Sequence, residues 1–245
     1  MVSVEAAHDM SLTLLKGFTL SAGQSRVPVT SSAQQVIAFL ALRGRPCARS
    51  EVAGTLWSQT PTARANANLR STLWRVQQSG HHVVDVSAQE IAIADHIQVD
   101  IREAIDRAHR ILNTACSCEE ILTVDTLEHL SADLLPNWYD SDWILIEQER
   151  YHQLRLYGLE AMAERYTAAG RHGEAVAAAL AAVRAEPLRE TAHRVLILAH
   201  LAAGNRCEAV RQYQLCRQII LDELGLEPSL KLDQLLLAER SMTTP

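Results

Sequence analysis

Hydrophobic and polar positions in the first hundred residues predict short strands, then three helices, then a hairpin. Apolar residues alternate with polar ones over 11–30, which is typical of strands that bury one face. The spacing then becomes helical over 31–44, 50–57 and 62–78, with Ser31-Ser32 placed to cap the first helix. A second alternation over 83–93 predicts a β-hairpin.

After this hairpin the strand signals end and helical spacing continues to residue 240. Helices are predicted at 100–113, 119–131, 143–169, 172–185, 188–203, 206–224 and 229–240. We therefore expect a mixed α/β domain over residues 1–99 and an all-α domain over residues 100–245.

Two blocks in the second half repeat at a spacing of 34 residues. Ala-Gly-Arg at 169–171 precedes Glu-Ala-Val at 174–176, and Ala-Gly-Asn at 203–205 precedes Glu-Ala-Val at 208–210. Helix-turn-helix units of this length are the tetratricopeptide signature, and stacked units leave a concave surface for a partner. An ordinary helical bundle with two similar turns is the alternative.

Charge is distributed unevenly along the chain. The net charge is −6, yet residues 1–99 hold eight Lys/Arg and six Asp/Glu, while residues 100–245 hold 15 and 23. Between Arg43 and Arg75 there are six arginines and one acid, Glu51. A local basic surface on an acidic protein is compatible with a DNA-binding regulator, although a chance scatter of arginines would give the same numbers.

Several classes of protein find no support in the sequence. We find no apolar run long enough for a membrane span and no secretory signal, so we expect a cytoplasmic location and no membrane contact. The five cysteines are an odd number, so we expect reduced thiols. No glycine-rich phosphate loop or catalytic constellation appears, and Cys116-Ser117-Cys118 lacks the partners of a zinc site. We therefore expect no cofactor, no bound metal and no enzymatic activity.

The third predicted helix carries the strongest indication of function. With Leu69 at the centre of its buried face, Ala65, Leu73 and Val76 share that face. The segment 62–80 contains neither acid nor lysine, whereas a merely solvated face usually mixes Glu with Lys. Its outward side and flank carry Arg, Asn and Ser, which can donate hydrogen bonds to phosphates and base edges. The candidate DNA-binding residues are Arg64, Asn68, Arg70, Ser71 and Arg75.

Other conspicuous side chains near this helix have a simpler interpretation. Trp57 is expected in the core. Trp74 points between the two faces of the third helix, so packing under the hairpin and contact with the DNA backbone are both open to it. The core is the expected position, because tryptophan is more often a packing residue than a contact residue. His81 and His82, at the entrance of the hairpin, are expected to be exposed loop residues.

Several strings resemble the antibiotic regulatory protein (SARP/AfsR) family over most of the chain. AFLALRG at 38–44, SEVA…LW at 50–57 and ANLRSTLWRV at 67–76 resemble its winged-helix domain. AVRQY at 209–213 and, more specifically, LDELGLEPS at 221–229 look like the end of its bacterial transcriptional activator domain.

The resemblance implies a mainly α fold: an N-terminal OmpR-like winged helix (α/β) followed by an all-α tetratricopeptide-like domain. It implies an activator that binds direct repeats of double-stranded DNA at promoters and recruits RNA polymerase, through sigma and other subunits, to genes of secondary metabolism. The third helix would enter the major groove and the hairpin would meet the minor groove, with a homodimer possible. Many members have a more basic end to the third helix, where this chain has Gln77-Gln78.

A tetratricopeptide-like protein-interaction adaptor without sequence-specific DNA binding is the alternative function, and the acidic second half agrees with it. An enzyme is a third class, for which no nucleophile, base or metal ligand can be named.

Overall fold

The computed structural model describes residues 10–113, 119–139 and 142–241. The chain folds into two units, Met1–Ala104 with Ala132–His152, and Ile105–Ser131 with Gln153–Pro245. The division into domains 1–99 and 100–245 stays a prediction; the N-terminal unit of the structure also includes residues 132–152.

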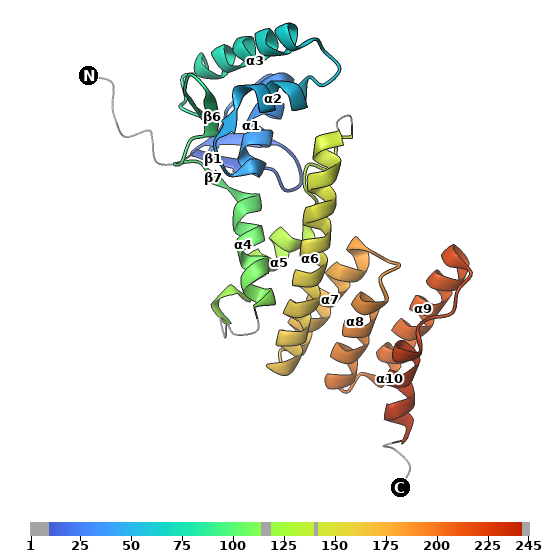
Figure 1. The fold of residues 1–245 in the computed structure, drawn as a ribbon. Coiled ribbons are helices and arrows are strands. Elements are labelled where there is room, and N and C mark those ends of the chain that lie inside the picture. The colour runs from blue at the N-terminus through green and yellow to red at the C-terminus, as the bar shows by residue number, and fades with distance from the viewer. Residues whose placement is uncertain (1–9, 114–118, 140–141, 242–245) are drawn as a thin grey trace. The chain divides into compact units, whose positions relative to one another are not determined.

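The first unit contains two small sheets, three complete helices, and the first residues of α4 (Asp100–Leu112) and α6 (Asp142–Ala168) (Figure 1). The strands of one sheet are β1 Met10–Thr13, β2 Thr19–Ala22, β3 Ser25–Arg26 and β7 Gln98–Val99. Their order is β3-β2-β1-β7, and β1 is antiparallel to β2 and parallel to β7. The other sheet has the antiparallel order β4-β6-β5, with strands β4 Cys47–Ala48, β5 Val84–Val86 and β6 Glu90–Ile93. The helices are α1 Ser31–Arg43, α2 Arg49–Leu56 and α3 Thr62–Gln77.

These elements follow the predicted order, with two corrections. The two-residue strands β4 and β7 were not predicted, because two residues are too short to show an alternation. The cap predicted at Ser31-Ser32 is wrong: Thr30 is the N-cap of α1 and makes no side-chain capping bond.

Helix α1 lies at the centre of the core of the first unit. Every residue from Val36 to Ala41 is fully buried, so the helix is covered on all sides rather than on one face. The ring of Phe39 packs edge-on against Trp143 at 5.3 Å between centroids, and α1 contacts α2, α3 and β6. The core therefore holds α3 against the body of the unit by its aliphatic side.

Asp100 links the start of α4 to the end of β1. Its carboxylate accepts hydrogen bonds from the backbone N–H groups of Leu14 at 2.9 Å, Leu15 at 3.0 Å and Ile101 at 2.7 Å. Main-chain donors that the short strands leave unpaired are satisfied in this way.

The second unit is helical throughout its described residues. Its elements are α5 Val124–Ser131, α7 His172–Ala185, α8 Glu190–Ala202, α9 Arg206–Leu224, α10 Leu230–Ser241, a short 3-10 turn at Glu119–Ile121, and parts of α4 Asp100–Leu112 and α6 Asp142–Ala168. Figure 1 shows α7, α8 and α9 lying one beside the next, and the first two of these share a core of alanines and aliphatic residues. Six of the helical segments predicted after residue 99 are confirmed to within two residues, but the segment predicted at 119–131 is a 3-10 turn at Glu119–Ile121 followed by α5, which begins at Val124.

The two predicted repeat turns have the same hydrogen bonds. After α6, Gly170 has φ +72° and the N–H of Arg171 donates to the carbonyl of Tyr166 at 2.9 Å. After α8, Gly204 has φ +76° and the N–H of Asn205 donates to the carbonyl of His200 at 2.8 Å. Both are Schellman turns, in which a left-handed glycine ends one helix and reverses the chain. The structure therefore supports the tetratricopeptide interpretation over a bundle with turns that are alike by chance.

Candidate nucleic-acid interface

The two sides of α3 differ sharply in burial. Ala65, Leu69, Leu73 and Val76 are each no more than 3% exposed, so the predicted buried face is confirmed. On the other side Arg64, Arg70, Ser71 and Arg75 are exposed, and Asn68 is half-buried. The structure therefore brings the five candidate residues onto the accessible surface of one helix.

Local sequence defines both ends of this helix. Pro61 occupies the N-cap, and its carbonyl accepts the N–H groups of Arg64 at 2.9 Å and Ala65 at 3.0 Å. Proline suits this place because a helix start needs no main-chain donor there. The helix ends at Gln77, and Gly80 continues the chain with φ +79°, which turns it toward β5. Along its length α3 contacts α1, α2 and β5.

The six arginines between Arg43 and Arg75 fall into two groups. The first group, Arg43, Arg45 and Arg49, binds carboxylates or a carbonyl of the protein itself. The guanidinium of Arg45 lies 2.9 Å from the carboxylate of Glu51, and this hydrogen bond is the main cause that raises the pKa of Arg45. Arg43 pairs with Glu147 at 3.3 Å. Arg49 donates to the carbonyl of Ser87 at 3.4 Å.

The second group consists of the arginines of α3. Within the part of the chain that the structure describes, Arg64, Arg70 and Arg75 have no ion pair or side-chain hydrogen bond. Their cationic charges are therefore uncompensated at short range, and they are the arginines that can bind an external anion.

Trp74 is not in the core, and that prediction is wrong. Its side chain is 61% exposed. It follows Leu69 by five residues, which is about 140° around a helix, so helical geometry itself turns it outward. The general preference of tryptophan for packing was the misleading argument. Trp57 is half-buried, so its predicted core position is only partly confirmed.

The β5–β6 hairpin makes up the wing of this unit. Its turn is closed by Ser87, whose hydroxyl accepts the N–H of Glu90 at 2.9 Å and donates to the Glu90 carbonyl at 3.0 Å. His82 is exposed as predicted, pairs with Asp85 at 2.9 Å and stacks on His96, with 5.6 Å between ring centroids. His81 is half-buried, short of the exposure predicted for it. No lysine or arginine lies in the hairpin from Val84 to Ile93.

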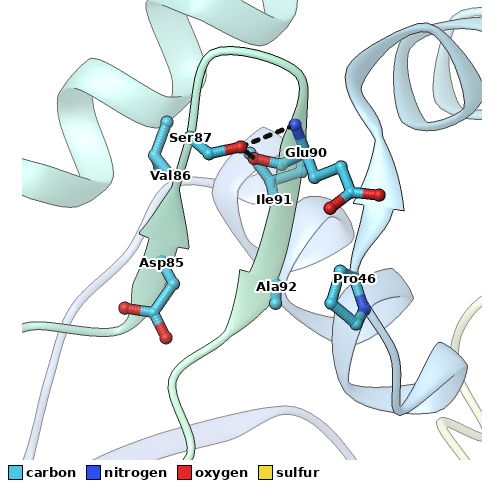
Figure 2. A pocket seen from close by; sticks show the side chains of 7 residues that line it. All are labelled: Pro46, Asp85, Val86, Ser87, Glu90, Ile91 and Ala92. Carbon is cyan, nitrogen blue, oxygen red and sulfur yellow. Dashed lines mark hydrogen bonds between the residues drawn. The ribbon is translucent and has the colours of Figure 1, made fainter.

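A hollow of about 290 Å³ lies on the outer side of this hairpin (Figure 2). It is lined by Pro46, Asp85, Val86, Ser87, Glu90, Ile91 and Ala92. Its two carboxylates disfavour a phosphate there by like-charge repulsion. Among the described residues, no group of three or more His, Cys, Asp or Glu side chains is arranged to hold a metal ion. The hollow is therefore a poor site for a DNA phosphate.

The geometry as a whole defines a class of protein. A winged helix exposes a third helix whose arginines have no acidic partner among the described residues, and a separate unit carries stacked helical repeats. No helix among the described residues is long and apolar enough to cross a membrane. This combination is typical of two-domain regulators of transcription.

Comparison with known proteins agrees with this class. A family model described as the bacterial transcriptional activator domain matches residues 84–238, more than half of the chain, so the protein belongs to that family and is a transcriptional regulator.

Two curated relatives are both called regulatory protein AfsR. The one from Streptomyces coelicolor is 29% identical over 219 residues, which cover 84% of this chain and 22% of the relative. The one from Streptomyces griseus is 25% identical over 210 residues, which cover 81% and 21%. This chain thus spans about a fifth of the length of each relative. The resemblance to the SARP/AfsR family is confirmed.

A solved structure shares the fold. The structure described as Mycobacterium tuberculosis EmbR in complex with low affinity phosphopeptide has a TM-score of 0.70 and 21% sequence identity, and the match covers 92% of this chain and 63% of that one. The predicted fold class, a winged helix followed by a tetratricopeptide-like domain, is confirmed.

Proposed function

We propose that this protein is a DNA-binding activator that uses α3 to bind promoter direct repeats and its helical repeat unit to recruit RNA polymerase, for genes of secondary metabolism. One observation carries the DNA-binding part: the only charges on the outward side of α3 within the described residues are arginines that no acid neutralises. The backbone of duplex DNA is a regular array of anions, which such a surface complements.

The five candidate residues divide the work by chemistry. Arg64, Arg70 and Arg75 bind phosphates and fix the position of the helix. Ser71 is short, neutral and exposed and is suited to hydrogen bonds with base edges. The half-buried Asn68, in contrast, lies beside Arg64 and Arg75 and is suited to a phosphate oxygen. Because the hairpin from Val84 to Ile93 carries no cation, the wing contributes little to the electrostatic part of binding.

Activation is assigned to the second unit. Its family model is named for transcriptional activation, and its residues are net acidic, so it is not itself suited to bind DNA. We propose that it contacts sigma or another subunit of RNA polymerase, and that two copies of the chain occupy adjacent direct repeats. Addition of the protein to an in-vitro transcription reaction would then raise initiation from a promoter that carries the repeats.

The DNA-binding proposal is tested by the salt dependence of binding to a duplex selected by the full-length protein from a random pool. Fluorescence anisotropy gives Kd at several salt concentrations for the wild type and for Arg70→Ala and Arg75→Ala. Each phosphate contact that is lost reduces the slope of log K against log salt by about 0.9. Arg45→Ala is the matched control, because this guanidinium is already bound to Glu51.

Two outcomes would refute the proposal. Unchanged slopes for both α3 variants would show that these arginines do not bind phosphate. The second outcome is that the protein enriches no sequence from the pool and keeps its cellular function after all three α3 arginines are neutralised. This result would favour the protein-interaction adaptor instead.

A further inference from the structure

We propose that Trp74 reads thymine in the operator, by packing its indole ring against the 5-methyl groups of thymine bases in the major groove. This inference rests on the proposed function, because it needs α3 to enter the groove. It starts from a feature that phosphate binding does not use: the largest side chain on the outward face of α3 is apolar and 61% exposed.

The order of side chains around α3 places Trp74 between two cationic rims. Measured from Leu69, Arg70 lies at about 100°, while Arg64 and Arg75 lie at about 220° and 240°. Trp74, at about 140°, falls inside this arc. When a helix with such an arc lies in the major groove, its rims face the two phosphate backbones and the middle of the arc faces the base edges.

The neighbours that precede Trp74 within the arc are small, whereas the exposed Gln78 follows it by one turn at about 180°. Ala67 and Ser71 lie at about 160° and 200°, and they precede the indole along the helix by about two turns and one turn. Both are exposed, and neither projects far from the helix axis. The helix can therefore approach the bases closely enough for the indole to contact them.

The chemistry of the groove then selects the base. Among the groups that base pairs present in the major groove, the thymine methyl is the apolar one. An indole ring cannot accept a hydrogen bond from a cytosine or adenine amino group through its nitrogen, which is a donor only. Contact with a methyl group also removes apolar surface of both partners from water, and this is favourable in itself.

The surroundings of Trp74 within the protein offer no competing role. Trp138 and Trp143 each have an aromatic partner in the first unit, at 6.3 Å from Phe18 and 5.3 Å from Phe39. Among the described residues Trp74 has no ring contact and no hydrogen bond of its indole N–H. Its apolar surface is available to a partner without any rearrangement of the core.

The test replaces thymine with deoxyuridine, which removes the methyl group and leaves the hydrogen-bonding edge unchanged. A duplex selected by the full-length protein is synthesised with one thymine at a time exchanged, and Kd is measured by anisotropy. For the wild type we expect a loss of about fourfold for each methyl group that the indole covers. Trp74→Ala should bind the thymine duplex more weakly and should no longer distinguish it from the deoxyuridine duplex at those positions.

Gln77→Ala is the matched control, since Gln77 is exposed on the same helix, at about 80° and outside the arc. It should keep the preference for thymine. Because Trp74 is exposed, Trp74→Ala should melt within about 2 °C of the wild type.

The possible failures are distinguishable. If the wild type selects a sequence but tolerates deoxyuridine at every position, or if Trp74→Ala retains the preference, thymine reading by Trp74 is refuted and the proposed function stands. Normal discrimination by Trp74→Ala with lost activation in vitro would refute it too, and would show that the indole contacts polymerase. If no sequence is selected at all, the proposed function itself fails.

Discussion

Two glutamates one turn apart on α6 allow the effect of burial on an ion pair to be measured. Glu160 is 9% exposed and accepts hydrogen bonds from Arg189 Nε at 2.7 Å and from the hydroxyl of Thr191 at 2.6 Å. Glu164 pairs with Arg194 at 2.8 Å. Both pairs join α6 to the start of α8, so the change to alanine removes the same kind of link in each.

Their surroundings predict very different losses of stability. The side chains of the Glu160–Arg189 pair are 12% and 16% exposed, against 51% and 37% for Glu164–Arg194. Removing one member of a buried pair leaves the other charge and its donors without a partner, which costs about 3 kcal/mol. An exposed pair exchanges its partner for water, so Glu164→Ala should cost about 0.5 kcal/mol. The hydrogen bond to Glu160 also raises the pKa of Arg189, which agrees with a favourable pair.

Urea unfolding followed by far-UV circular dichroism measures both variants. With a slope of about 2 kcal/mol per molar urea, Glu160→Ala should lower the midpoint by about 1.5 M and Glu164→Ala by about 0.3 M. All four tryptophans lie in the first unit, so their fluorescence should report an unchanged transition there. Equal losses for the two variants would refute the reasoning that burial decides the strength of these pairs.

Three further predictions concern stability and reactivity. Asp100→Ala leaves the N–H groups at the end of β1 without their acceptor and should destabilise the first unit by about 1–3 kcal/mol, measured by tryptophan fluorescence in urea; a loss below about 0.5 kcal/mol would show that water replaces the carboxylate. Desolvation lowers the pKa of His193 against the opposing effect of the Pro187 carbonyl, and the amide of Gln212 lies 2.7 Å from its Nδ1, as suits a neutral ring. The contribution of His193 to stability is therefore complete above its unfolded pKa of about 6.5 and is lost as the pH falls below it. His193→Gln should flatten the unfolding free energy between about pH 7 and pH 5, and an unchanged pH profile would contradict this. Burial raises the pKa of Cys216 to about 11, so a thiol reagent at pH 8 should label the exposed Cys207 and leave Cys216 unmodified until the protein is unfolded, as mapped by mass spectrometry; equal labelling rates in the native protein would be the contrary result.

Local sequence determined most of the secondary structure of this protein. The left-handed conformation at Gly170 and Gly204 is accessible to glycine at no steric cost, so the turns could be predicted from a 34-residue spacing without any tertiary contact. The aliphatic stripe of α3 was equally visible, because a period of 3.6 residues leaves a helix only one way to bury Leu69 and Leu73 together. The family strings added the order of the two domains.

Tertiary structure decided which charges and rings are available to a partner. Arg45 and Arg70 look alike in the sequence, but the fold places a carboxylate against the first and none against the second. Arg43 is neutralised by Glu147, which is 104 residues away, and periodicity carries no information over that distance. For Trp74 the two sources act together: the helical period places it outside the buried stripe of Leu69, and the elements that pack around α3 leave that side of the helix uncovered, so the ring is exposed despite the preference of tryptophan for packing.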